Sequence, residues 1–176
     1  MSWRLKIPET GLLVVDVQEK LVAAVKEPAD WVERVEILVK AAKLLEIPVA
    51  ITEQVPAKLG KTVPAVLQAV GKVSPVSKTA FSAAEAGRGL GRKRVLVVGC
   101  EAHVCVRQSV YDLRLKEVQP VLVADAVGSR RESDRQLVLQ EMRQDGIVVA
   151  STEAVLFELM ETSEHPKFKE IQGLIK

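Results

Sequence analysis

The stretch Arg94-Val-Leu-Val-Val-Gly-Cys-Glu-Ala-His-Val-Cys-Val-Arg-Gln-Ser-Val-Tyr111 decides the fold of this chain. Its aliphatic run from Val95 to Val98 is typical of a strand that is buried on both faces, and Gly99 ends the run. From His103 onward the apolar residues recur at helical spacing. The stretch therefore predicts a buried strand that turns into a helix, with Cys105 at the turn.

Cys105 lies near the beginning of this expected helix. A thiol in that position feels the positive end of the helix dipole, which favours the thiolate. The backbone N–H groups of the first turn have no helical partner and can donate to a developing oxyanion. The position suits a nucleophile. Because a free cysteine is also a common small buried hydrophobic residue, this stretch alone leaves both interpretations open.

The composition is that of one ordinary globular domain. In 176 residues, 48% are hydrophobic and 27% are charged, which predicts a single domain over residues 1–176. The net charge is +2 and aromatic residues make up 3%, so we expect no nucleic-acid partner. No run reaches the roughly 18 apolar residues of a membrane span, and the N-terminus does not resemble a signal peptide. Cys100 and Cys105 are expected to be free thiols in the cytoplasm.

Predicted strands and helices alternate along the chain. The expected strands cover residues 11–16, 47–52, 73–78, 95–98, 120–125 and 147–151. The expected helices cover residues 18–25, 31–45, 62–70, 83–90, 103–113, 133–144 and 152–160, with a last one within 166–176. No two strands are close enough in sequence for a hairpin. The pattern therefore predicts an α/β fold, a three-layer α/β/α sandwich around a parallel sheet.

Two familiar ligand motifs are not supported. Gly87-Arg-Gly-Leu-Gly91 is rich in glycine, but it leaves a helix and enters a strand, the reverse of a dinucleotide loop. The two histidines, His103 and His165, lack the spacing of a metal site. His103 is also a weak candidate for a catalytic base, because residues two apart in a helix do not face each other. We expect no metal and no cofactor.

Three polar residues stand at the carboxyl ends of expected strands, where ligands bind in open α/β sheets. They are Asp16, Lys78 and Cys105. Asp16 can equally cap a helix, and Lys78 can be a solvated charge at an edge. Taken together they offer a carboxylate to accept the thiol proton, an ammonium to hold the thiolate, and a nucleophile. Spacing shows only that this constellation is possible.

Four motifs resemble a known family, and three of them contain these residues. They are Leu13-Val-Val-Asp-Val-Gln18, Lys78-Thr-Ala-Phe-Ser82, Gly99-Cys-Glu-Ala-His-Val-Cys-Val106 and Ala124-Asp-Ala-Val-Gly-Ser129. The chain resembles the isochorismatase-like cysteine hydrolases, a superfamily that also contains nicotinamidases and N-carbamoylsarcosine amidases. Three further pieces resemble the isochorismatase domain-containing protein subgroup: Thr52-Glu-Gln54, Lys58-Leu-Gly60 and the tail His165-Pro-Lys-Phe-Lys-Glu-Ile-Gln172. Nicotinamidases carry metal-binding histidines after the second strand, and this chain has none there.

The resemblance implies a site and an assembly. It implies a catalytic triad of Asp16, Lys78 and Cys105, and a cis peptide before Glu101 that directs the amides of Glu101 and Cys105 at one oxyanion. By analogy of position, Gln18 and Phe81 are candidates to contact the substrate. It also implies a Rossmann-like sheet of six parallel strands and a homo-oligomer, a dimer or a tetramer.

We therefore expect a metal-independent cysteine hydrolase that cleaves a small amide or related C–N bond through a thioester on Cys105. The alternative is a non-catalytic protein that keeps the hydrolase fold and binds a small molecule or serves as a scaffold. A redox role for the Cys105 thiol is a third possibility, and it predicts a sulfenic acid or a bond to Cys100 after mild oxidation.

Overall fold

A computed structural model describes residues 4–25 and 28–176 of the chain. Within these residues the strands form one six-stranded sheet in the order β3-β2-β1-β4-β5-β6, and every pair in it is parallel. The predicted fold class is confirmed. The strands are β1 (Thr10–Val15), β2 (Val49–Gln54), β3 (Val76–Lys78), β4 (Arg94–Cys100), β5 (Gln119–Gly128) and β6 (Val148–Ala150).

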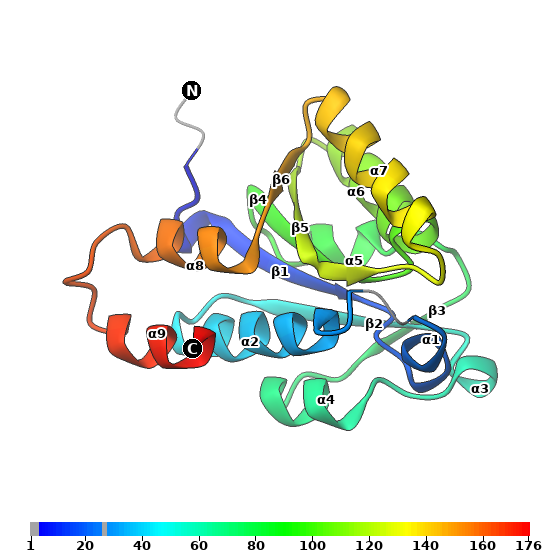
Figure 1. Cartoon of the computed structure of the whole chain (residues 1–176), viewed down its shortest axis with the longest axis horizontal. Coiled ribbons are helices and arrows are strands. Elements are labelled where there is room, and N and C mark those ends of the chain that lie inside the picture. Colours follow the sequence, from blue (N-terminus) through cyan, green and yellow to red (C-terminus); the bar gives the residue numbers. More distant parts are fainter. Residues whose placement is uncertain (1–3, 26–27) are drawn as a thin grey trace.

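Helices cover both faces of the sheet (Figure 1). Their bounds are α1 (Glu19–Ala24), α2 (Trp31–Leu44), α3 (Pro56–Leu59), α4 (Pro64–Val70), α5 (Ala84–Gly89), α6 (Arg107–Leu115), α7 (Glu132–Gln144), α8 (Thr152–Met160) and α9 (Phe168–Ile175). One apolar core joins the sheet to α2, α4, α8 and α9, and the other joins it to α5, α6 and α7. The central strands β1 and β4 are buried along their whole length, as their aliphatic runs predict.

Several local boundaries differ from the predicted ones. Strand β5 runs on to Gly128, so Asp125 does not end it; its carboxylate accepts hydrogen bonds from the N–H and hydroxyl of Thr152 at 2.8 and 2.9 Å. The interval 53–61, expected to be a loop, holds the last two residues of β2 and helix α3. Helix α7 begins at Glu132, one residue before the predicted start.

The turn after β4 also differs from a plain helix start. Residues Ala102–Val106 form a short π-helical turn, η2, before α6 begins at Arg107. The N–H of Val106 bonds to the carbonyl of Glu101 at 3.2 Å, five residues back, which is the π-helical spacing. Such turns occur often at functional sites, and this one carries Cys105.

Gly99 brings β4 against β1 immediately before this turn. Its φ is +116°, and a Cβ at this position would lie 2.0 Å from the carbonyl oxygen of Val15. The atom in the way belongs to the backbone and cannot move without separating the two central strands. Only glycine fits here.

We expect Gly99→Ala to lower the free energy of unfolding by at least about 3 kcal/mol, because it adds a steric clash to a strained φ. Urea denaturation followed by circular dichroism measures this change. The control is Gly173→Ala in α9, where a Cβ meets nothing within 4 Å and alanine favours the helix by about 1 kcal/mol. Equal stability of the two variants would contradict the assignment.

Candidate active site

The structure brings the three predicted site residues to the carboxyl edge of the sheet. Asp16 directly follows β1, Lys78 is the last residue of β3, and Cys105 lies in the turn η2 after β4. Because parallel strands all end at the same edge, segments far apart in sequence meet there. Asp16 has a φ of +50°, in the left-handed region that aspartate and asparagine tolerate better than most residues. This bend turns the chain away from the sheet directly after β1.

An ion pair between Asp16 and Lys78 is the centre of the cluster. The distance between Lys78 Nζ and Asp16 Oδ2 is 2.6 Å, the Asp16 side chain is fully buried, and that of Lys78 is 11% exposed. The hydroxyl of Thr52 donates to the other carboxylate oxygen at 2.7 Å. A carboxylate removed from water needs such partners. Both oxygens of Asp16 are thus held in fixed directions.

Lys78 is held equally firmly. Its ammonium donates to Gln54 Oε1 at 2.8 Å and to the carbonyl oxygens of Phe81 and Ala80 at 2.9 and 3.2 Å. Together with Asp16, these acceptors exceed the three protons of the ammonium group. The positive charge therefore stays at one point beside Asp16.

Cys105 is coupled to this pair through its thiol, whose pKa responds, after burial, to the Asp16 carboxylate, to the Lys78 ammonium and to hydrogen bonding by the backbone N–H of Glu101. Burial, followed by the negative charge of Asp16, raises the pKa of Cys105 to about 12, although Lys78 acts in the opposite direction. The expectation of a stabilised thiolate is therefore wrong for the resting protein. Burial of the thiol outweighs the effect of the helix end here.

The segment that carries Cys105 follows a cis peptide bond and is held by a buried serine on its other side. The peptide bond between Cys100 and Glu101 is cis. Beyond the thiol, the buried hydroxyl of Ser109 donates to the carbonyl of Cys105 at 2.6 Å and accepts from the N–H of Ala83 at 2.8 Å. Ser109 thus connects the nucleophile turn to the beginning of α5, next to the loop whose carbonyls hold Lys78.

The two predicted substrate contacts differ in exposure. Gln18 is fully buried, and its amide bonds to the N–H and carbonyl of Gln54 and to the carbonyl of Gly60 at 2.7, 3.2 and 2.6 Å. It therefore ties the segment after β1 to the end of β2. The Phe81 side chain is 52% exposed beside the Lys78 loop. Contact of either residue with a substrate stays a prediction.

His103 and Cys100 make their side-chain hydrogen bonds to groups other than the Asp16 carboxylate and the Lys78 ammonium. His103 Nδ1 is 3.0 Å from the Ser129 hydroxyl, and its Nε2 is 3.9 Å from Asp134 Oδ2. Cys100 is a buried free thiol that donates to the carbonyl of Asp16 at 3.2 Å. Burial raises its pKa well above the ordinary value. The position of His103 near Cys105 in the sequence therefore does not make it a partner of the thiol; its ring bonds to Ser129 instead.

Sequence reasoning missed Thr52 and Gln54 as members of the cluster, although it quoted them within a family motif. Their one signal was position: two polar residues at the end of an apolar strand, spaced so that both side chains lie on one face. Ser109 gave no such signal, because a serine within a helix is ordinary.

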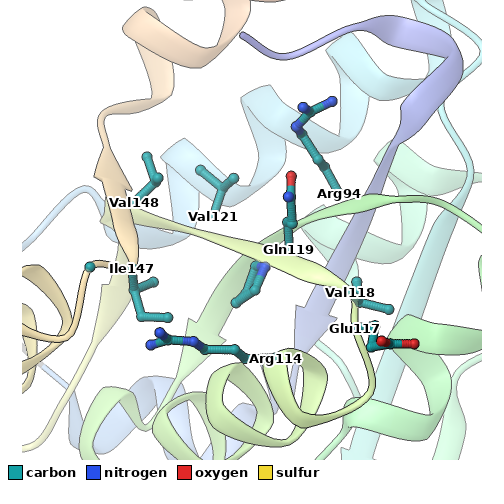
Figure 2. A pocket seen from close by; sticks show the side chains of 10 residues that line it. Arg94, Arg114, Glu117, Val118, Gln119, Val121, Ile147 and Val148 are labelled. Atoms are coloured by element: carbon teal, nitrogen blue, oxygen red, sulfur yellow. The ribbon is translucent and has the colours of Figure 1, made fainter. Parts of the chain in front are cut away.

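No group of three or more His, Cys, Asp or Glu side chains within the described residues is arranged to hold a metal ion. None of the helices in this part of the chain is long and apolar enough to cross a membrane. A cavity of about 320 Å³ lies at the opposite, amino-terminal edge of the sheet (Figure 2). Arg94, Arg114 and Gln119 line it together with apolar residues of β5 and β6, and no member of the cluster does so.

Comparison with known proteins places the chain in a class. Its fold matches that of the MAR1 ribonuclease of Caenorhabditis elegans with a TM-score of 0.92 and 38% identity, over 98% of this chain and 92% of that one. It also matches the ycaC product of Escherichia coli, described as an octameric hydrolase of unknown specificity, with a TM-score of 0.86 and 21% identity over 99% and 96% of the two chains. Both matches cover nearly the whole chain, which therefore shares their α/β fold.

The chain belongs to the isochorismatase domain family. The family model for the isochorismatase domain matches residues 10–154. The chain is 37% identical to isochorismatase domain-containing protein 2 of Danio rerio, over 98% of this chain and 89% of that protein. The predicted family is confirmed.

The charges around Cys105 lead to a prediction about its reactivity. Asp16→Asn removes the negative charge and keeps a residue that tolerates the φ of +50°. We expect the pKa of Cys105 to fall and its alkylation by iodoacetamide at pH 8 to become faster than in the wild type, because less charge opposes the thiolate. Lys78→Met should slow the same reaction. Mass spectrometry of the Cys105 peptide across pH 7–11 measures both rates, and a slower Asp16→Asn variant would contradict this electrostatic account.

Proposed function

We propose that this protein is a metal-independent cysteine hydrolase that cleaves a small amide or a related C–N bond, with Asp16, Lys78 and Cys105 as its catalytic triad. The observation that carries the proposal is the buried Asp16–Lys78 ion pair at 2.6 Å, at the same edge of the sheet as the Cys105 thiol, whose pKa responds to both charges. A nucleophile hydrogen-bonded to a base that a third group holds in place is the general form of such sites. Family membership supports the hydrolase assignment.

The first half of the reaction forms a thioester. Asp16 accepts the proton of the Cys105 thiol as the sulfur attacks the carbonyl carbon of the substrate. The amides of Glu101 and Cys105 donate to the tetrahedral oxyanion, each being worth about 3–4 kcal/mol in comparable sites. As the intermediate collapses the C–N bond breaks, and Asp16 returns the proton to the leaving amine.

The second half regenerates the enzyme. Asp16 accepts a proton from a water molecule, whose oxygen attacks the thioester carbonyl. The C–S bond breaks, the thiolate recovers the proton, and a carboxylic acid leaves. Water is the only co-reactant in this balance, and the scheme uses no metal or cofactor.

The high pKa of Cys105 favours one version of this chemistry. With a pKa of about 12, the sulfur carries its proton at neutral pH. Deprotonation therefore accompanies the attack, with Asp16 as general base, instead of preceding it in a resting ion pair. The Lys78 ammonium compensates the charge that remains on the sulfur and the carboxylate throughout.

RNA cleavage is the competing function, because one relative at 38% identity is named a ribonuclease. Two features of this chain argue against it. Its 25 Lys and Arg residues nearly balance 23 Asp and Glu residues, and the one lysine of the cluster already pairs with Asp16. Binding to a polyanion needs an excess of positive charge. We propose a small-molecule substrate and no nucleic-acid partner.

We propose further that the protein works in the cytoplasm as a homo-oligomer. Several large apolar side chains are exposed on the single chain, among them Leu115 at 82% and Leu137 at 66%. Apolar surface of this kind is what a second copy covers in an assembly. Two free thiols agree with a reducing compartment. Light scattering after size-exclusion chromatography measures the assembly.

The wild type should release amine from at least one member of a panel of small primary amides and ureido acids. Cys105→Ala should abolish this release with the fold intact, and Asp16→Asn should lower kcat by about 10²–10⁴-fold because the general base is lost. Cys100→Ser, which changes the second thiol and keeps a donor to the Asp16 carbonyl, serves as the control and should stay close to wild type.

Three results would overturn the proposal. A Cys105→Ala variant that still hydrolyses the amide would exclude the thioester. If the wild type cleaves a fluorogenic RNA and Cys105→Ala does not, the ribonuclease function would be favoured. A compound that raises the melting temperature without being consumed would instead support the non-catalytic binding protein.

A further inference from the structure

Glu101 contacts the nucleophile turn through its backbone on both sides. Hydrogen bonding by its N–H lowers the pKa of the Cys105 thiol. Its carbonyl accepts from the N–H groups of Val104 and Val106 at 3.1 and 3.2 Å, and the bond from Val106, five residues on, is the π-helical bond of the turn that carries Cys105. The orientation of this one residue therefore sets both the amide donor and the path of the turn.

The side chain of Glu101 is fixed from a different part of the chain. Its carboxylate, only 9% exposed, accepts at Oε1 from Arg130 Nε at 2.9 Å and from the Arg130 backbone N–H at 3.1 Å. Arg130 follows β5, which pairs with β4 up to the Cys100–Gly128 register position. The contact thus connects the segments that leave two neighbouring strands.

We propose that Arg130, acting through the carboxylate of Glu101, is a positioning residue that holds the Glu101 amide on the Cys105 sulfur. This inference rests on the proposed function. A nearly buried carboxylate that loses its charged partner is no longer held in place and turns toward solvent. This change moves the backbone of Glu101, whose amide is then no longer directed at the sulfur.

The outer side of Arg130 is open to solutes. Its side chain is 62% exposed, and with His103, Arg131 and Asp134 it lines a surface cavity of about 300 Å³. Removing the arginine side chain leaves a space that a guanidinium ion can reach from solvent. The charge can thus be taken away and returned within one variant.

The same cavity supplies a matched control. Arg131 is the next residue, is also exposed, and lines the same cavity. The hydrogen bonds of the Glu101 carboxylate come from Arg130 and not from Arg131. Arg131→Ala therefore removes an equal charge from the same place without touching Glu101.

The first measurement needs no turnover. The Glu101 amide lowers the pKa of Cys105, so its displacement should raise that pKa and slow alkylation at pH 9 by about threefold or more. We expect this in Arg130→Ala and Glu101→Ala, with wild-type rates in Arg131→Ala. Adding guanidinium chloride at millimolar concentration should restore Arg130→Ala toward wild type and leave Glu101→Ala unchanged. Glu101→Gln, which keeps the acceptor oxygen, should lie between the extremes.

The second measurement uses an amide that the wild type hydrolyses. We expect Arg130→Ala to lower kcat by about tenfold to a hundredfold with little change in KM, because the oxyanion donor is misplaced and substrate binding is not. The double variant Glu101→Ala/Arg130→Ala should be no worse than Glu101→Ala alone, since both act through one contact.

The outcomes separate this inference from the proposed function. If alkylation responds as described but no amide is hydrolysed, the positioning role stands and the proposed function fails. Wild-type alkylation in Arg130→Ala, with a lowered melting temperature only, would reduce the pair to a structural salt bridge and overturn the inference. An equal effect of Arg131→Ala would assign the change to general surface charge and overturn it as well.

Discussion

The buried ion pair between Asp16 and Lys78 is the constraint on which the site depends. At 2.6 Å and nearly out of water, neither charge is tolerated without the other. The pair joins the ends of β1 and β3, two strands separated by β2, and Thr52 and Gln54 of β2 contact its two members. The sheet order therefore shapes the site, because it places the polar end of β2 next to both Asp16 and Lys78.

The same pair explains the state of the thiol. A lysine beside a cysteine is often taken as a sign of a resting thiolate, yet Lys78 is paired with Asp16, whose charge raises the pKa of Cys105 by more than Lys78 lowers it. The sum of burial and two opposite charges leaves a protonated sulfur in the resting site. Such a site protects its nucleophile from oxidation and alkylation, since these reactions need the thiolate. In the proposed mechanism the thiol loses its proton to Asp16 only when the carbonyl group of a substrate is present.

Much of the fold could be predicted from sequence because its signals are local. The aliphatic runs of β1 and β4 identify central parallel strands, and the alternation of elements then requires one edge for all strand ends. Other features depend on contacts between distant residues. The pKa of Cys105 reflects burial, the full engagement of the Gln18 amide depends on Gly60, and the Glu101–Arg130 contact spans 29 residues. No periodicity in the sequence carries that information.

The nucleophile turn shows how such long-range contacts become part of the site. The π-helical turn and the positive φ of Gly99 are both unusual backbone features, and both lie within eight residues of the end of β4. Unusual backbone persists only where its surroundings determine it. Ser109 fixes this segment from the side of α5, and Arg130 fixes it from the side of β5. Ser109 and Arg130 thus hold the turn from two different elements. The positions of the Cys105 sulfur and the Glu101 amide therefore depend on how the elements around the sheet pack together.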